Sequence, residues 1–266
     1  MSNSVLRIFS YLPNPRVWKA QIAADLGGVE VEVIGDKPAK LGTWLWDFAA
    51  RELPADERSD TSPYARTGRR GFSGTLYKTD EFLSAHPFGT VPAAFSPDGE
   101  VGIFESNSIL RAVARAADPS AALYGSDTQL ASRIDSFLDA NLVFAREAQV
   151  YLLALENIDS ATHERMRQAY EFYLSGIENA LGHSEFIAGS TLSIADISFV
   201  CDFAQFLREG HYTKQLVAAG LEQISHNGRN IWPRAYSHML SLSETPVFAR
   251  HMGSYLTWYR DATADS

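Results

Sequence analysis

The chain has 266 residues, of which 45% are hydrophobic and 21% are charged. This composition excludes an intrinsically disordered chain, and the length suits two modest domains that each bury a core. The 23 lysine and arginine residues against 32 aspartate and glutamate residues give a net charge of −9, which argues against nucleic acid as a partner.

The first third of the chain alternates strand and helix signals. Residues 5–11 form an apolar run that ends before Pro13, and residues 17–26 have helical character up to the breakers Gly27 and Gly28. Residues 29–34 alternate apolar and acidic side chains, the period of a half-buried strand. The sequence therefore predicts a β-α-β unit and an α/β domain.

Residues 36–78 interrupt this pattern and are interpreted as an inserted segment. The segment holds Trp44, Trp46 and Phe48, followed by a polar stretch. A structureless loop of this length is uncommon in a compact domain, so we expect a short helix around residues 43–51 and a role as a lid or interface.

Regular structure resumes after residue 79. Residues 90–95 and 101–104 flank a Pro-Asp-Gly turn and predict a β-hairpin, and a helix should begin near Ser106. Every segment after about residue 125 has helical character; the helices are expected at residues 127–155, 162–181, 193–208 and 234–242. We therefore predict an α/β domain over residues 1–118 and an all-α domain over residues 124–266.

Cysteine usage and hydropathy indicate the compartment. The single cysteine, Cys201, cannot form an internal disulfide and lies among apolar residues, so we interpret it as a core residue. No apolar run approaches the roughly 20 residues that cross a bilayer, and the N-terminus lacks a signal-peptide pattern. The seven histidines show no metal-ligand spacing. We expect a soluble, cytoplasmic protein without membrane or metal partners.

Four groups of residues, in this order, resemble the cytosolic glutathione transferases. They are the segment 8–24, Val91-Pro92, the run Phe104-Glu105-Ser106-Asn107-Ser108-Ile109, and the segments 186–189 and 192–197. The first group is most similar to the subgroup that contains the N-terminal domain of elongation factor 1B gamma. The resemblance implies a thioredoxin-like glutathione-binding domain followed by a helical domain that shapes a pocket for an apolar second substrate. It also implies glutathione as co-substrate and a dimer with an identical or related chain.

The resemblance assigns glutathione binding to Val91, Pro92, Glu105 and Ser106. A Val91–Pro92 bond in the cis form would turn the Val91 backbone towards the ligand; the alternative is a trans proline on an edge strand. Ser106 falls between a strand and a helix, where its hydroxyl and the helix N-terminus suit a carboxylate, and it would also serve as a simple N-cap. Glu105 would accept hydrogen bonds from the ligand's ammonium group.

The residue that activates the glutathione thiol is expected in the loop before the first helix. Alignment with the family places Asn14 where serine-type members carry the catalytic serine, so this chain departs from the serine, tyrosine and cysteine types. Asn14 followed by Pro15 is also a good helix start. Ser10 and Arg16 are the other catalytic candidates, while Tyr11 is interpreted as a packing residue.

These residues leave two main functions open, and a third, a glutathione carrier or stress-response binder without turnover, differs from the first only in kinetics. The first is a glutathione transferase acting on an apolar, aromatic electrophile, with glutathione-dependent cleavage of β-aryl ethers as its most specific form. Its second pocket would use some of the aromatic residues Trp44, Trp46, Phe48, Phe137, Phe144 and Tyr151. The second function is a non-catalytic module for protein assembly.

Ser193 and Asp196 match a capping box and are interpreted as structural.

Overall fold

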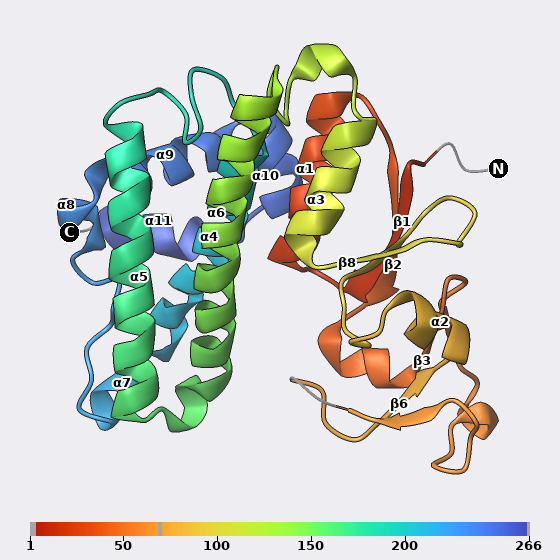
Figure 1. Cartoon of the computed structure of the whole chain (residues 1–266). Coiled ribbons are helices and arrows are strands. Elements are labelled where there is room, and N and C mark those ends of the chain that lie inside the picture. Colours follow the sequence, from red (N-terminus) through yellow and green to blue (C-terminus); the bar gives the residue numbers. More distant parts are fainter. Residues whose placement is uncertain (1–3, 69–70, 265–266) are drawn as a thin grey trace. The chain divides into compact units, whose positions relative to one another are not determined.

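The computed structural model describes residues 4–68 and 71–264, and the chain divides into two compact units, Met1–Asp118 and Pro119–Ser266. Every strand of the described residues lies in the first unit, and the second unit is helical (Figure 1). The predicted α/β region followed by an all-α region is confirmed. None of the described helices combines the length and apolarity needed to cross a membrane.

The first unit is built on a sheet with the strand order β2-β1-β7-β8. Its strands are β1 (Leu6–Tyr11), β2 (Val31–Asp36), β7 (Ala93–Phe95) and β8 (Gly102–Phe104). Strands β1 and β2 are parallel, whereas β7 is antiparallel to both β1 and β8. The predicted β-α-β unit and hairpin are therefore present. Ile8 and Phe9 of β1 are buried because this strand is in the interior of the sheet.

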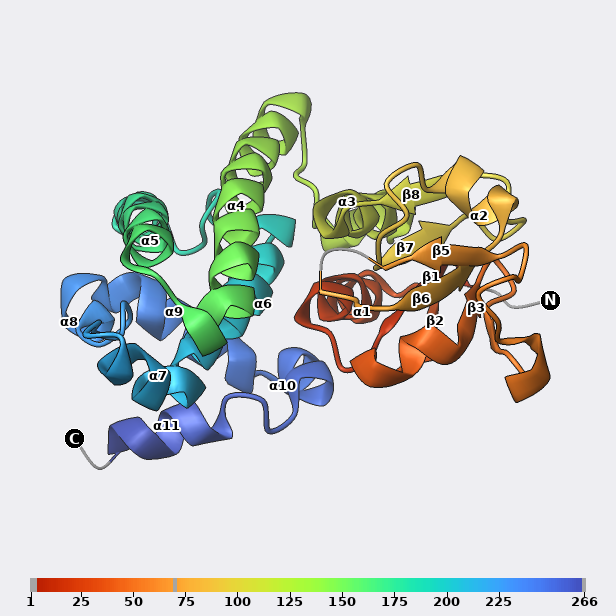
Figure 2. The same ribbon diagram turned by 90° about the horizontal axis from the view of Figure 1, so that it is seen from below.

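Three helices accompany this sheet: α1 (Pro15–Gly27), α2 (Asp80–Ala85) and α3 (Ser106–Ala116). Helices α1 and α3 pack side by side on one face, and α2 lies on the other (Figure 2). Helix α1 begins with Asn14 as N-cap and Pro15 in its first turn, and it ends at Gly28, whose φ of 64° favours glycine.

The segment 36–78 corrects one prediction. Residues 43–51 do not form a helix; they contain strand β3 (Trp44–Trp46) and the start of β4 (Arg51–Glu52). With β5 (Ala65–Thr67) and β6 (Thr75–Lys78), they form a second sheet of order β4-β3-β6-β5. Strand β3 pairs with β6, which lies at the far end of the segment, so the pairing has no local sequence signal. A 3-10 turn, Pro38–Thr43, leads into β3.

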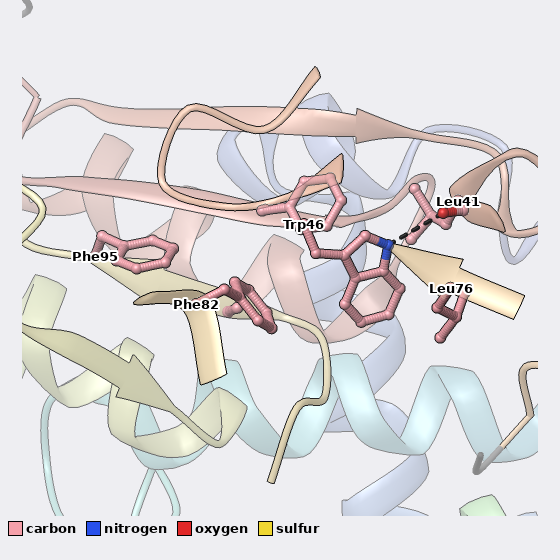
Figure 3. Packing of buried hydrophobic residues seen from close by; sticks show 7 residues of the cluster. Leu41, Trp46, Leu76, Phe82 and Phe95 are labelled. Atoms are coloured by element: carbon pink, nitrogen blue, oxygen red, sulfur yellow. Dashed lines mark hydrogen bonds between the residues drawn. The ribbon is translucent and has the colours of Figure 1, made fainter. Parts of the chain in front are cut away.

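Trp46 belongs to the core of the first unit, and the partly buried Trp44 and Phe48 pack against that core. Trp46 is 1% exposed, its indole Nε1 donates to the Leu41 carbonyl at 3.1 Å, and its ring packs edge-on against Phe82 (Figure 3). Phe48 packs edge-on against Phe95 of β7. The proposed use of Trp46 in a second-substrate pocket is therefore wrong, because burial leaves its ring no contact with solvent.

The second unit contains four helices close to the predicted ranges and several short ones. The long helices are α4 (Thr128–Ala154), α5 (Ser160–Leu181), α6 (Ile194–Phe206) and α9 (Pro233–Glu244). The shorter helices are α7 (Thr213–Ala218), α8 (Gly228–Ile231), α10 (Pro246–Met252) and α11 (Thr257–Ala264). Ser193 and Asp196 form the predicted capping box at the start of α6, and Cys201 is buried within that helix.

Candidate functional site

The strand register brings three predicted site segments to one edge of the main sheet. Phe9 of β1 pairs with Ala93 of β7, and Ala93 pairs with Phe104 of β8. Continuing both registers by one residue places Ser10, Pro92 and Glu105 on one line across the three strands. A further step on β7 and β8 places Val91 opposite the start of α3.

The Val91–Pro92 peptide bond is cis, as the resemblance implied. Pro92 is buried and Val91 is partly exposed, and both directly precede β7. Within the described residues, the Val91 main chain forms no hydrogen bond with another backbone group. Its N–H and C=O can therefore pair with an extended peptide in the manner of an added strand.

Glu105 and Ser106 occupy the sharp transition from β8 to α3. Glu105 has φ 65° and ψ 126°, a conformation that is strained for a residue with a side chain, and its carboxylate does not cap the helix. The side chain of Glu105 is exposed, whereas Ser106 is 7% exposed. Strain of this kind is often found at binding sites. The first N–H groups of α3 and the Ser106 hydroxyl form a favourable place for a carboxylate.

Asn14 and Ser10 are brought together at the end of β1. The Asn14 amide nitrogen Nδ2 donates to Ser10 Oγ at 3.0 Å, and its Oδ1 accepts from the Arg16 backbone N–H at 2.9 Å. Both Asn14 and Ser10 are 0% exposed. The side chain of Arg16 is partly exposed, and the Tyr11 ring lies against Phe72. Asn14 is thus the N-cap of α1, and its amide also contacts Ser10, another candidate for activating the thiol.

Gly35 allows β2 to approach the end of β1 closely. Its φ is 153°, and a Cβ atom built on it would overlap the Ser10 carbonyl oxygen. Only glycine lacks that atom, so the pairing of Ser10 with Gly35 fixes the end of β1.

The structure adds one residue that the sequence reading missed. Lys19 of α1 is 0% exposed, and its Nζ donates to Ser106 Oγ at 3.2 Å and to Asn107 Oδ1 at 2.8 Å. The only local signal is a single lysine in the otherwise apolar or neutral run of residues 17–24. A lysine in such a run is rarely buried unless it has partners.

The helical unit has its own apolar groove, of about 630 Å³, between α4 and α5. Phe137 lines this groove together with Tyr173 and the exposed Phe172. Phe144 and Tyr151, the other predicted pocket residues of α4, are 1% and 0% exposed and belong to the core, so that prediction is corrected for these two. The described residues contain no group of three side chains arranged for a metal ion.

The fold is that of the cytosolic glutathione transferases: a thioredoxin-like sheet with α1 and α3 on one face, followed by an all-helical region. The chain has TM-scores of 0.66 with a glutathione transferase from Phanerochaete chrysosporium solved with oxidized glutathione and 0.62 with one from Methylobacillus flagellatus solved with glutathione bound. Both are 15% identical to this chain; the first match covers 97% of this chain and 98% of its counterpart, and the second covers 92% and 98%.

Sequence comparison finds two kinds of relative. The chain is 25% identical over 196 residues to the glutathione S-transferase-like protein LUC7 of a Fusarium species, covering 72% of this chain and 73% of that protein. It is 26% identical over 198 residues to elongation factor 1-gamma of Carassius auratus, covering 73% of this chain but only 36% of the elongation factor. No family model matches the chain. The predicted resemblance to both groups is confirmed.

Proposed function

We propose that this protein is a glutathione transferase that binds glutathione at the edge of its main sheet. The proposal rests on the strand register, which aligns Pro92 with Glu105 and Val91 with Ser106. The same register places Pro92 opposite Ser10, just before the start of α1. The Val91 backbone would pair with the cysteinyl unit of glutathione. Ser106 and the first turn of α3 would hold the γ-glutamyl carboxylate, and Glu105 would accept from the ammonium group.

The proposed reaction is a nucleophilic substitution by the glutathione sulfur. The thiol loses its proton to solvent, and the thiolate attacks an electrophilic carbon of an apolar, aromatic co-substrate. A carbon–sulfur bond forms, and the leaving group departs with the electron pair of the broken bond. Binding and orientation of the two reactants supply much of the rate in a reaction of this kind.

The thiol is activated in this proposal at the N-terminus of α1. A free thiol has a pKa of about 8.5, and the positive end of a helix lowers such a pKa. Asn14, Ser10 and Arg16 remain the candidate catalytic residues. Asn14 and Ser10 are enclosed, so their contact with the sulfur requires a shift of the loop, whereas Arg16 is partly exposed and can contribute its positive charge.

β-Aryl ethers and aryl halides are the first electrophiles to screen, since both present an aromatic group and a leaving group to a thiolate. The burial of Trp46 removes one reason to favour aryl ethers over the halides. We further propose a cytoplasmic dimer, with an identical or a related chain as the second subunit.

A non-catalytic assembly module is the second candidate function. It is favoured by the similarity to elongation factor 1-gamma, which covers 73% of this chain. In that function the same fold would present a surface to another protein, and the glutathione site would have no catalytic role.

Calorimetric titration with reduced glutathione separates these functions. The transferase proposal predicts micromolar-to-millimolar binding and an ultraviolet thiolate band that titrates below the free-thiol pKa of about 8.5. Ser106→Ala should weaken binding by about 1–3 kcal/mol, because the carboxylate loses a hydrogen-bond donor. Ser108→Ala, on the same helix, is the matched control and should bind like the wild type. Absence of binding at several millimolar would contradict the transferase and favour the assembly module.

A further inference from the structure

Lys19 links the two helices that carry the candidate site. It lies on α1, five residues after the N-cap Asn14, and its Nζ reaches the first two residues of α3. Burying an ammonium group costs several kcal/mol unless hydrogen bonds and charge offset that cost. Lys19 of α1 is buried with its Nζ hydrogen-bonded to two side chains at the start of α3.

The hydrogen bond from Lys19 fixes the direction of the Ser106 hydroxyl. A serine hydroxyl has one hydrogen to donate and lone pairs that accept. Because Nζ can only donate, Ser106 Oγ is the acceptor in their 3.2 Å contact. The Ser106 hydroxyl hydrogen must then point away from Lys19, where it is available to an acceptor such as a carboxylate.

The same contact adds charge to the carboxylate position. The N-terminus of α3 provides a partial positive charge, and the Lys19 ammonium adds a full positive charge one hydroxyl group away. Charge acts strongly here because Lys19 is 0% exposed and Ser106 is 7% exposed, so solvent screens the field weakly.

We propose that Lys19 is a positioning residue for the α-carboxylate of the γ-glutamyl group of glutathione: it orients the Ser106 hydroxyl towards that carboxylate and stabilises its negative charge. This inference rests on the proposed glutathione site. Lys19 does not touch the ligand; it acts through Ser106. Its second contact, with Asn107 Oδ1 at 2.8 Å, holds Nζ in place.

The test measures how Lys19 variants bind two ligands by calorimetry. The ligands are reduced glutathione and 4-aminobutyryl-cysteinyl-glycine, which keeps the amino group but lacks the α-carboxylate. Lys19→Met removes the charge at nearly constant length and should weaken glutathione binding at least tenfold. It should change binding of the decarboxylated ligand less than twofold. Lys19→Arg keeps the cation and should recover most of the affinity for glutathione.

A double-mutant cycle separates positioning from a purely structural role. If Lys19 acts through the Ser106 hydroxyl, the Met substitution should cost much less affinity in a Ser106→Ala background than in the wild type. Equal losses for both ligands would overturn the inference, and additive losses in the cycle would show that Lys19 does not act through Ser106, which overturns its role as a positioning residue. Wild-type protein that binds no glutathione would overturn the proposed function as well, whereas normal binding by Lys19→Met overturns the inference alone.

A measurement on the wild type covers the case in which Lys19→Met does not fold. Protein labelled with nitrogen-15 in its lysine side chains reports on Nζ directly by NMR. The Lys19 Nζ resonance should shift on addition of glutathione and stay unchanged with the decarboxylated ligand. The absence of a shift with saturating glutathione would overturn the inference.

Discussion

Asn14 donates a hydrogen bond to Ser10, with 3.0 Å between Nδ2 and Oγ. The other end of the same amide accepts from the Arg16 backbone N–H at 2.9 Å. The buried Asn14 side chain therefore connects the end of β1 to the first turn of α1 by hydrogen bonds. The position that the resemblance assigned to thiol activation is also a structural cap, and the two roles make different predictions.

Replacing Asn14 with alanine tests both roles at once. Loss of the N-cap should lower the free energy of unfolding by about 1 kcal/mol. If the amide also stabilises the thiolate, the pKa of bound glutathione should rise, because the sulfur loses a donor that favours its charged form. Urea unfolding measures the first effect, and the ultraviolet absorbance of the thiolate across pH measures the second.

Ser10→Ala is the matched control for that variant. It removes the acceptor of Asn14 Nδ2 and leaves the cap at Oδ1 intact, so it separates the two hydrogen bonds of the amide. A thiol pKa unchanged in Asn14→Ala but raised in Ser10→Ala would contradict a direct role of the amide and assign it to the serine hydroxyl.

The parts of the fold that sequence predicts are those set by local patterns. The helix start at Asn14-Pro15, the stop at Gly28 and the hairpin around residues 96–101 each depend on a few neighbouring residues, and each is present. The resemblance to the glutathione transferases identifies the site residues Val91, Pro92, Glu105 and Ser106. Their convergence follows from strand order, which a local pattern does not specify.

The parts that sequence missed depend on distant contacts. Strand β3 is apolar on both faces and pairs with β6, which lies beyond the polar stretch of the segment. Lys19 meets Ser106 over a separation of 87 residues, and no spacing rule connects them. The positive φ of Glu105 is likewise set by the turn into α3 rather than by its residue type.

Trp46 should contribute strongly to stability because it lies in the core. Trp46→Ala removes a side chain that is 1% exposed and contacts Leu41, Phe9 and Phe82, so we expect a loss of about 3–5 kcal/mol in the free energy of unfolding. Circular dichroism in urea gives the value. Val101→Ala, at a position that is 57% exposed, should change stability by less than about 0.5 kcal/mol. Similar small losses in both variants would mean that the segment 36–78 is not part of the core.

His86 should make the protein sensitive to acid. The imidazole is 1% exposed and lies among the rings of Phe82, Phe95 and Phe104, and this burial lowers its pKa from 6.5 to about 4. In the unfolded chain the histidine takes up a proton near pH 6.5. Between pH 6.5 and about 4 the unfolded state therefore binds more protons, and the stability that His86 contributes is lost as the pH falls.

His86→Phe keeps an aromatic ring in this position and removes the titration. The wild type should lose stability more steeply than the variant as the pH falls from 6.5 to about 4, by up to about 1.4 kcal/mol per pH unit. Urea unfolding at several pH values gives the two slopes, and NMR of the imidazole gives the pKa in the folded protein. Parallel stability curves, together with an imidazole that titrates near 6.5, would show that the ring is hydrated and not enclosed by the three phenylalanines.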